Sequence, residues 1–163
     1  MKVLVVNLKL KRIVIILFFV YLSLVFFVNF VSDSTYFILE GFRSGYTGVQ
    51  HNILPFTTIV TYLFNFNSYK QDTWFYNTFG NILLFVPMGM LLPLLSTKLT
   101  RWFLTTVIIV LFSFTIETMQ LITQLGVFDV DDILLNTLGG YFGYLIYVLF
   151  KDKGYIIKKL RDK

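Results

Sequence analysis

The stretch from Trp102 to Thr123 reads WFLTTVIIVLFSFTIETMQLIT and contains one charged residue, Glu117. An apolar helix of about 20 residues is long enough to cross the hydrocarbon core of a bilayer, which is about 30 Å thick. We therefore expect this stretch to be a membrane-spanning helix, and the rest of the chain is placed around it.

Three more stretches are candidates for spans. Residues 13–31 and 133–150 meet the same criterion of length and apolarity. Residues 82–95 are short for a span and contain Pro87 and Pro93, so a re-entrant segment is the alternative. Extending this stretch back to residue 77 gives a workable length. The predicted fold is an all-α membrane protein, a single domain over residues 1–163 with four spans, at about 13–31, 77–95, 102–123 and 133–150.

The overall composition agrees with a membrane protein. Of the 163 residues, 56% are hydrophobic and only 14% are charged, whereas about a quarter of a soluble domain is charged. The chain has no cysteine, which excludes a disulfide framework, a cysteine nucleophile and a cysteine-based metal site. The first apolar stretch follows basic residues, as in a signal peptide. It is longer than the usual signal-peptide core of roughly 7–15 residues and no A-x-A-like site follows, so we expect it to be retained.

Basic residues predict the orientation. With four spans, all lysines and arginines except Arg43 and Lys70 fall in three short segments: residues 1–12, 96–101 and 151–163. Such segments stay in the cytoplasm. Both termini are therefore predicted to be cytoplasmic, with an outer loop at residues 32–76. A re-entrant second stretch would put the basic tail outside. That tail is expected to contact anionic lipid rather than nucleic acid.

The outer loop contains a pattern typical of an amphipathic helix. Its apolar residues follow the spacing i, i+3, i+4, i+7, i+8: Phe56, Ile59, Val60, Leu63 and Phe64. Pro55 suits the first position of such a helix. We expect a short helix that lies on the outer leaflet or packs over the bundle.

Polar residues gather at one membrane level, the outer ends of the spans. Glu117, Gln120 and Gln124 are spaced to share one helix face, and Asp129, Asp132 and Asn136 repeat that spacing. Asn81 opens the second span, and Asp131 lies in the same outer turn as the other aspartates. Asp129 is predicted to be the N-cap of the fourth span. The glycines of that span are predicted to allow close packing on a neighbouring helix: Gly139, Gly140 and Gly143.

These residues also have simpler interpretations. The aspartates are explained equally well by a helix cap and a solvated turn, and Glu117 and Gln120 by hydrogen bonds between helices. A divalent-cation site from Glu117, Asp129 and Asp132 is a further hypothesis. His51 is either a base or phosphate contact or an ordinary loop residue. The chain lacks the H-E-x-x-H, P-loop, G-x-S-x-G and G-x-G-x-x-G motifs.

Four ordered motifs carry a resemblance to a known family. They are His51–Phe56 (HNILPF), similar to N-L-x-P-F; Asn81–Gly89 (NILLFVPMG), similar to N-x-x-x-F-x-P-x-G; Ser113–Gln120 (SFTIETMQ), similar to S-x-x-x-E-x-x-Q; and Phe128–Gly140 (FDVDDILLNTLGG), similar to D-x-x-D-x-x-x-N-T-x-G-G. The chain thereby resembles the VanZ-like family of bacterial membrane proteins. Gly126 and Val127 stand where many relatives have a basic residue.

The resemblance implies a cell-membrane protein of a Gram-positive bacterium. The family's founding member is associated with lowered susceptibility to teicoplanin, a glycopeptide antibiotic with an acyl chain. We hypothesise a non-enzymatic membrane module whose outer polar site engages a lipid-anchored ligand, such as a lipoglycopeptide or a cell-wall precursor, or a partner helix, or that acts in cell-envelope maintenance. The residues chosen for this site are Glu117, Gln120, Asp129, Asp132 and Asn136, with Asn81 and Asn52 in second place.

Two other functions are kept as alternatives. In the first, the protein is a membrane enzyme acting on a lipid-linked or cell-envelope substrate, with Glu117 or Asp132 as general base or metal ligand. In the second, it is an ion or solute carrier, which fits less well because only Glu117 lies well within a span. Membrane lipids are the expected partners. No cofactor and no oligomeric state is assigned from the sequence.

Overall fold

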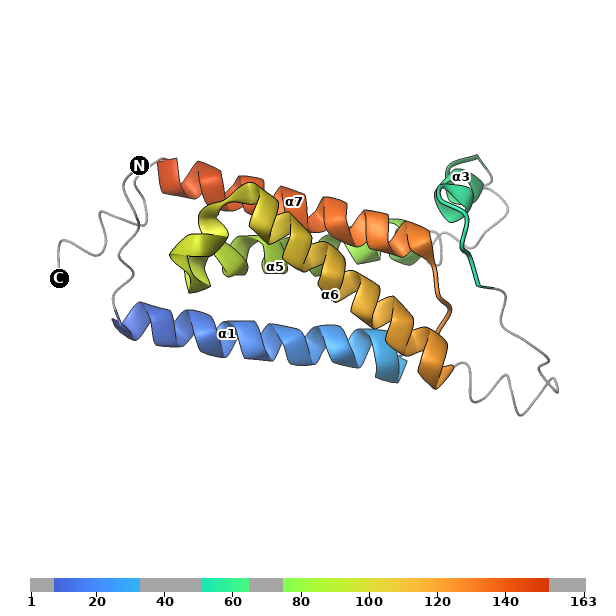
Figure 1. Ribbon diagram of the computed structural model, residues 1–163, viewed down its shortest axis with the longest axis horizontal. Coiled ribbons are helices and arrows are strands. Elements are labelled where there is room, and N and C mark those ends of the chain that lie inside the picture. Colours follow the sequence, from blue (N-terminus) through green and yellow to red (C-terminus); the bar gives the residue numbers. More distant parts are fainter. Residues whose placement is uncertain (1–7, 33–50, 65–74, 153–163) are drawn as a thin grey trace.

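The computed structural model describes residues 8–32, 51–64 and 75–152 (Figure 1). In this part of the chain, four long helices run alternately in opposite directions. The elements in chain order are α1 (Leu8–Phe27) with the π-helical turn η1 (Val28–Ser32), α3 (Thr57–Phe64), the π-helical turn η3 (Tyr76–Gly80), α5 (Asn81–Leu95), the 3-10 turn η4 (Thr97–Thr100), α6 (Trp102–Thr123) and α7 (Val130–Asp152). Most of the predicted outer loop and of the basic tail lies outside the described residues.

The four predicted spans are confirmed as helices of the length and apolarity that a membrane crossing needs. Among the described residues these helices cover Lys9–Val31, Thr78–Leu95, Trp102–Thr123 and Val130–Lys151. The start of α1 and the end of α7 lie at the same end of the bundle (Figure 1). Which side of the membrane that end faces stays a prediction.

The second span is helical despite its two prolines. α5 continues through Pro87 and Pro93, and η3 extends it at its beginning. Proline removes a backbone hydrogen bond from a helix, but membrane helices tolerate it when neighbouring helices pack around the break. The extension of this span back beyond Asn81 is therefore correct.

Glycines bring the backbones of α5 and α7 into contact. A Cβ atom on Gly89 would lie 1.8 Å from the carbonyl oxygen of Gly140, and one on Gly143 would lie 2.0 Å from that of Val86. A Cβ atom on Gly139 would likewise lie 2.1 Å from the carbonyl oxygen of Ile82. The predicted close packing of the fourth span is confirmed, and its neighbour is α5.

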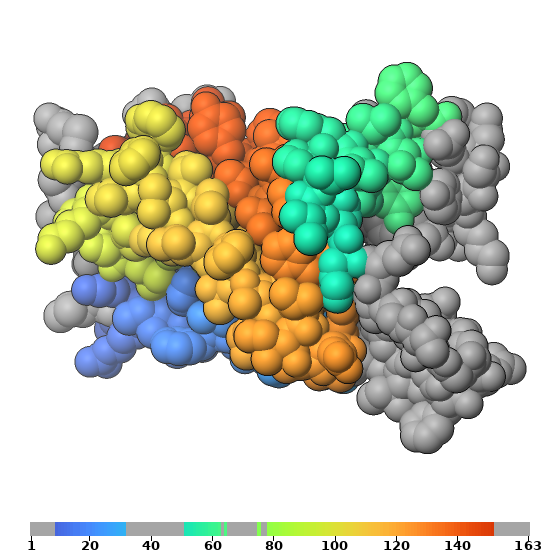
Figure 2. Space-filling view, turned by 45° about the vertical axis from the view of Figure 1, so that its right-hand side comes forward, coloured from blue at the N-terminus to red at the C-terminus, as the bar shows by residue number. Residues whose placement is uncertain are grey.

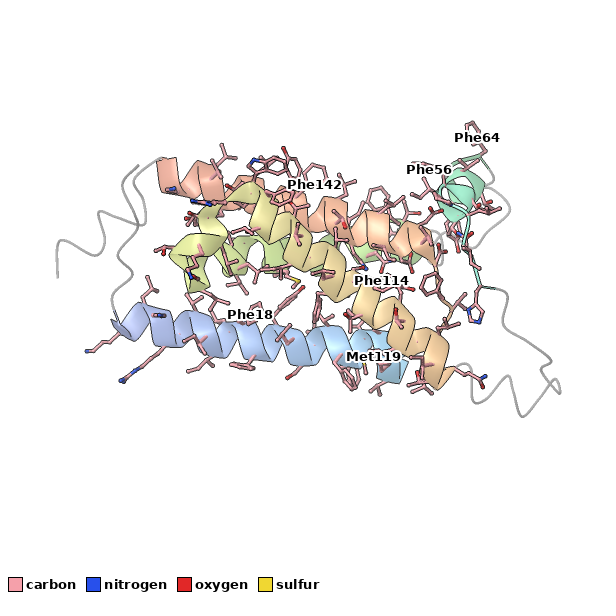
Figure 3. The ribbon with its side chains drawn as sticks, in the orientation of Figure 1. Phe18, Phe56, Phe64, Phe114, Met119 and Phe142 are labelled. Carbon is pink, nitrogen blue, oxygen red and sulfur yellow. The ribbon has the colours of Figure 1, made fainter. Side chains whose placement is uncertain are left out.

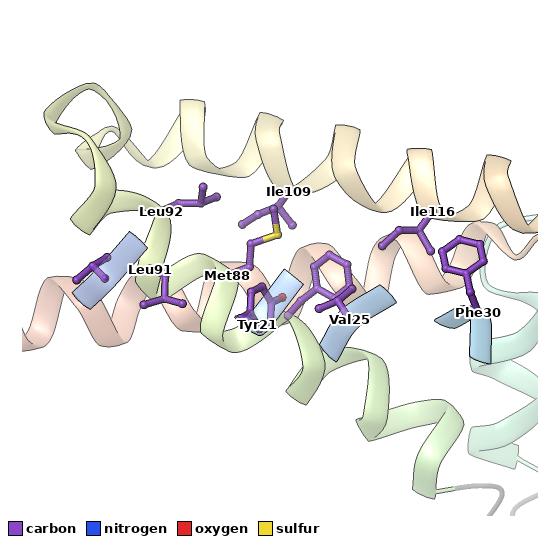
Figure 4. Packing of buried hydrophobic residues seen from close by; sticks show 10 residues of the cluster. Tyr21, Val25, Phe30, Met88, Leu91, Leu92, Ile109 and Ile116 are labelled. Atoms are coloured by element: carbon purple, nitrogen blue, oxygen red, sulfur yellow. The ribbon is translucent and has the colours of Figure 1, made fainter. Parts of the chain in front are cut away.

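The apolar core joins α1 to α5 and α6 (Figure 4). Its members are Val14, Tyr21, Val25, Phe30, Phe85, Met88, Leu91, Leu92, Ile109 and Ile116. The hydroxyl of Tyr21 donates a hydrogen bond to the carbonyl oxygen of Leu84, 3.0 Å away. Many more large apolar side chains stand on the outside of the bundle, as expected for helices surrounded by lipid (Figure 3).

Candidate functional site

A short loop segment is tied to the turn between α6 and α7. The N–H of Asn52 donates to the carbonyl oxygen of Phe128 at 2.9 Å, and the N–H of Val130 donates to the carbonyl oxygen of Asn52 at 3.1 Å. These two bonds form an isolated parallel β-bridge between Asn52 and Asp129. The bridge holds the segment leading to α3 against the end of the bundle, where α6 and α7 meet (Figure 2).

Asp129 joins this loop segment to α7 through its carboxylate. Its Oδ1 accepts hydrogen bonds from Nδ2 of Asn52 at 2.8 Å and from the N–H of Asp131 at 2.8 Å. Its Oδ2 accepts from the hydroxyl of Thr58 at 2.6 Å. The bond to Asp131, the second residue of α7, confirms Asp129 as the N-cap of that helix. The same side chain also fastens Asn52 and Thr58 to the bundle.

Asp131 is fully buried and caps α3 from another helix. Its Oδ2 accepts hydrogen bonds from the N–H groups of Thr58 and Ile59, at 2.7 and 3.0 Å, and its Oδ1 accepts from the N–H of Phe56. These are among the amides that a helix leaves without partners at its beginning. A carboxylate at this point also interacts favourably with the positive end of the helix dipole.

The position of Asp131 explains why the predicted start of α3 is wrong. Pro55 was expected at the first helical position, but α3 begins at Thr57. Phe56 has a φ of 68°, in the left-handed region that a phenylalanine rarely adopts. Phe56 is thus the residue before the helix, and the carboxylate of Asp131 supplies the cap that an apolar side chain cannot.

Glu117 is buried behind Asp129. Its side chain is 2% exposed, and its Oε2 accepts a hydrogen bond from the N–H of Asp129 at 2.9 Å. A buried carboxylate needs such partners because it has lost its hydration. Glu117 therefore connects α6 to the start of α7.

Asp132 and Asn81 extend the polar cluster towards α5. Asn81 lies beside the Asp132 carboxyl, which is also close enough to Glu117, Asp129 and Asp131 to interact with them electrostatically. Like charges this close repel one another, so the cluster favours cations or hydrogen-bond donors in its surroundings. The three helices α5, α6 and α7 all contribute to it.

Asn136 and Ser113 lie one helical turn deeper than Asp132 and Glu117, respectively. Nδ2 of Asn136 donates to the hydroxyl of Ser113 at 2.9 Å. Both side chains are buried, and Asn136 is 2% exposed. Its Oδ1 is also buried and has no hydrogen-bond partner among the described residues. Asn136 therefore presents an unpaired acceptor next to the carboxylates.

Gln120 and Gln124 separate from each other in the structure. Gln120 is buried, and its Nε2 donates to the carbonyl oxygen of Asn29 in η1 at 3.2 Å, which ties α6 to the end of α1. Gln124 is exposed and lies just past the end of α6 with a φ of 56°. The prediction that Gln124 continues the face of Glu117 and Gln120 is wrong because the helix ends at Thr123.

The hypothetical cation site is not formed. Within residues 8–32, 51–64 and 75–152, no three histidine, aspartate or glutamate side chains are grouped suitably to hold a metal ion. Both oxygens of Asp129 and one oxygen of Glu117 instead accept hydrogen bonds from protein groups. His51 is an exposed loop residue whose Nδ1 accepts a hydrogen bond from the N–H of Phe128 at 3.2 Å.

Three contributors to the cluster were not among the site residues chosen from the sequence, which are Asp131, Thr58 and Ser113. Asp131 lies between two residues that were chosen, and Ser113 opens one of the motifs. Thr58 carries no local signal, because its partner Asp129 is 71 residues away along the chain. Each of the chosen residues with a described side chain lies at the same end of the bundle.

Comparison with known proteins gives a family and one curated relative. The sequence pattern of the VanZ/LLP1 family matches residues 14–151. The chain is 28% identical to Protein VanZ of Enterococcus faecium over 101 residues, which are 62% of this chain and 62% of that protein. The match thus spans less than two thirds of the relative. No solved structure matches the chain.

Proposed function

This chain belongs to the VanZ/LLP1 family, and we propose that its outer polar site binds the polar part of a lipid-bearing ligand. It is a multi-pass membrane protein. The proposed ligand is a lipoglycopeptide of the teicoplanin type or a lipid-linked cell-wall precursor. Binding would lower susceptibility to the drug in the first case and serve cell-envelope maintenance in the second.

The observation that carries the proposal is the unpaired Oδ1 of Asn136. A buried acceptor without a partner costs about 1–3 kcal/mol of stability, and such a group in a folded protein calls for an explanation. A ligand that donates a hydrogen bond would provide the missing partner. The carboxyl group of Asp132 lies one turn away in α7 and that of Glu117 lies near it, so a donor on the ligand would find further oxygen acceptors there.

The chemistry of the site favours ligands with ammonium, hydroxyl or amide N–H groups. The side-chain oxygens that could contact the ligand, those of Glu117, Asp132 and Asn136, are all hydrogen-bond acceptors. We place binding above catalysis because Asp129 and Asp131, the other two carboxylates, are already engaged in holding α3. Glu117 and Asp132 are the two acids left for contact with a ligand.

The proposed topology puts this site at the outer face. In this orientation the basic residues at the other end of the bundle, such as Lys98 and Arg101, are cytoplasmic. α3 then lies at the level of the outer headgroups, where Phe56, just before the helix, and Phe64, at its end, are 60% and 80% exposed. An interfacial helix buries such side chains among lipids.

The test of the function is drug susceptibility in a Gram-positive host that lacks the protein. Wild type, Asp132→Ala and Glu117→Gln would be expressed at equal membrane levels, checked by immunoblot. The control is Gln124→Ala, because Gln124 is exposed and outside the cluster. We expect wild type and the control to protect against teicoplanin but not against vancomycin, and the two site variants to lose that protection.

The outcomes separate the parts of the proposal. If Glu117→Gln protects the cells as well as wild type does, the charge of Glu117 has no part in the mechanism. Unchanged susceptibility to both drugs with wild type would exclude the drug as ligand. The cell-wall precursor would then be tested by its binding to purified protein and to Asp132→Ala. Turnover of such a precursor by purified protein would favour the enzyme hypothesis instead.

A further inference from the structure

A groove runs between α1 and α6, on a different side of α6 from the carboxylate cluster. Its volume is about 440 Å³. The groove is lined from α1 and η1 by Phe19, Leu22, Ser23, Val25, Phe26 and Phe30, and from α6 by Phe112, Thr115, Ile116 and Met119. Figure 4 shows Val25, Phe30 and Ile116 between these two helices. The groove therefore occupies the half of the bundle nearer Gln120.

Two small residues, one on each helix, make room for the groove. Ser23 and Thr115 stand among phenylalanine, leucine, isoleucine and methionine side chains. The hydroxyl of Ser23 donates to the carbonyl oxygen of Phe19 at 3.0 Å, and that of Thr115 donates to the carbonyl oxygen of Leu111 at 2.7 Å. Both hydroxyl protons are thus used within their own helices. The remaining groove surface is suited to hydrocarbon.

The groove has a buried floor and an exposed rim. Val25 and Ile116 in the floor are buried, whereas Phe19 and Met119 at the rim are exposed. The rim continues the apolar outer surface of two membrane-spanning helices. The groove therefore faces the side of the two helices that the hydrocarbon of a bilayer would surround, so lipid acyl chains can reach it.

We propose that this groove binds one acyl chain of a glycerophospholipid from the outer leaflet. A volume of about 440 Å³ is within the usual range for ligand sites, and the occupant must be apolar throughout. A chain lying against the floor gains dispersion contacts that an ordinary chain on a convex helix surface lacks. The choice of leaflet rests on the topology proposed above, but the nature of the occupant does not.

The test uses full-length protein in nanodiscs that contain a phospholipid with a photoactivatable diazirine in its acyl chain. Crosslinked residues would be mapped by mass spectrometry. We expect crosslinks to concentrate on the groove residues of both helices, above the level at Leu121 and Ile122, which are exposed on α6 outside the groove. The double variant Ser23→Leu, Thr115→Leu fills the groove and is expected to lose this excess.

A matched control is available on the same helix. Thr118 also donates its hydroxyl to its own helix, to Phe114 at 2.7 Å, but does not line the groove. Thr118→Leu is expected to keep the wild-type crosslinks. An even distribution of wild-type crosslinks over α6, or the same excess in the double variant, would overturn the proposal. So would disulfide-linked dimers of Ser23→Cys in native membranes, because a second copy would then cover the groove.

These outcomes are independent of drug susceptibility. The crosslinking measures lipid contact in purified protein and involves none of the carboxylates. Loss of teicoplanin protection therefore leaves the groove proposal standing, and an empty groove leaves the polar site standing. Crosslinks from a probe restricted to the inner leaflet would overturn the leaflet assignment and, with it, the proposed orientation.

Discussion

The carboxylate of Asp131 accepts a hydrogen bond from the backbone N–H of Thr58, 73 residues earlier in the chain, at 2.7 Å. Through this bond, the start of α7 determines where α3 begins. A helix usually takes its cap from the residue just before it. Here that residue is Phe56, which has no acceptor in its side chain and has a strained φ of 68°. The orientation of α3 therefore depends on α7.

Replacing Asp131 by asparagine should release α3 from the bundle. The two carboxylate oxygens accept from Phe56 on one side and from Thr58 and Ile59 on the other. The side-chain amide of asparagine has only one oxygen, so on one side its NH2 group would face a backbone N–H group of this segment. Leaving that N–H without an acceptor should cost about 1–3 kcal/mol of stability. We expect faster amide hydrogen exchange at Thr58 and Ile59 with no change in α5. Thr57→Ala, which removes only a local bond to Leu54, is the control.

The glycine contact between α5 and α7 leads to a second prediction, which concerns stability. Gly89→Ala would place a methyl group 1.8 Å from the carbonyl oxygen of Gly140, and neither backbone can move aside without separating the helices. We expect a clear fall in the thermal unfolding midpoint in detergent, from a cost of about 1–3 kcal/mol or more. A Cβ atom on Gly80 would have no described atom of another segment within 4 Å, so Gly80→Ala should leave the midpoint unchanged or slightly raised. Equal midpoints for the two variants would contradict the packing.

Asn136 and Ser113 should behave as a coupled pair. Ser113→Ala removes the acceptor for Nδ2 of Asn136 and leaves both ends of that buried amide unpaired, which should lower the free energy of unfolding by about 1–3 kcal/mol. Adding Asn136→Leu removes the amide, so the double variant should recover much of the loss. The measurement is a double-mutant cycle in denaturant. Simple additivity would show that the two side chains do not interact.

The same pair connects stability with the proposed function. Asn136→Leu combined with Ser113→Ala removes the unpaired acceptor without leaving the buried Ser113 hydroxyl unpaired, so the folded protein should tolerate this double variant. If Oδ1 serves a ligand, this variant should nevertheless lose teicoplanin protection at normal membrane levels. Retained protection would show that the unpaired oxygen has no part in binding.

The end of α6 offers a stabilising substitution. Gln124 has a φ of 56° and a ψ of 25°, and its side chain is exposed. Glycine adopts this conformation without strain, so Gln124→Gly should stabilise the protein by roughly 1 kcal/mol, whereas Gln124→Ala should not. The thermal midpoints of the two variants in one detergent give the comparison. A midpoint for Gln124→Gly below that for Gln124→Ala would exclude the left-handed cap.

Single cysteines can test the orientation, because the chain has none of its own. Thr57→Cys and Lys98→Cys lie at opposite ends of the bundle, and both native side chains are exposed. A membrane-impermeant thiol reagent applied to intact cells should label Thr57→Cys at once and Lys98→Cys only after permeabilisation. The reverse pattern would put the carboxylate cluster inside the cell.

Local signals were enough to predict the four spans and two details within them. Each span is an apolar run whose transfer into lipid is favourable by itself, whatever the rest of the chain does. The glycines of α7 and the N-cap at Asp129 were likewise readable from neighbouring residues. The preference of proline for the first position of a helix was misleading at Pro55, because the start of α3 depends on Asp131 rather than on the residues of α3.

The partners within the polar cluster were decided by tertiary structure. The sequence indicated that these residues lie at one membrane level. It did not indicate which carboxylate accepts a hydrogen bond from which donor. That depends on how α6 and α7 pack and on where the loop segment crosses their ends, which joins residues 71 to 77 positions apart. Hydropathy is a property of each segment, whereas a hydrogen bond needs two groups brought to within about 3 Å. The apolar runs could therefore be predicted singly, and the roles of Asp131, Asn136 and Gln124 could not.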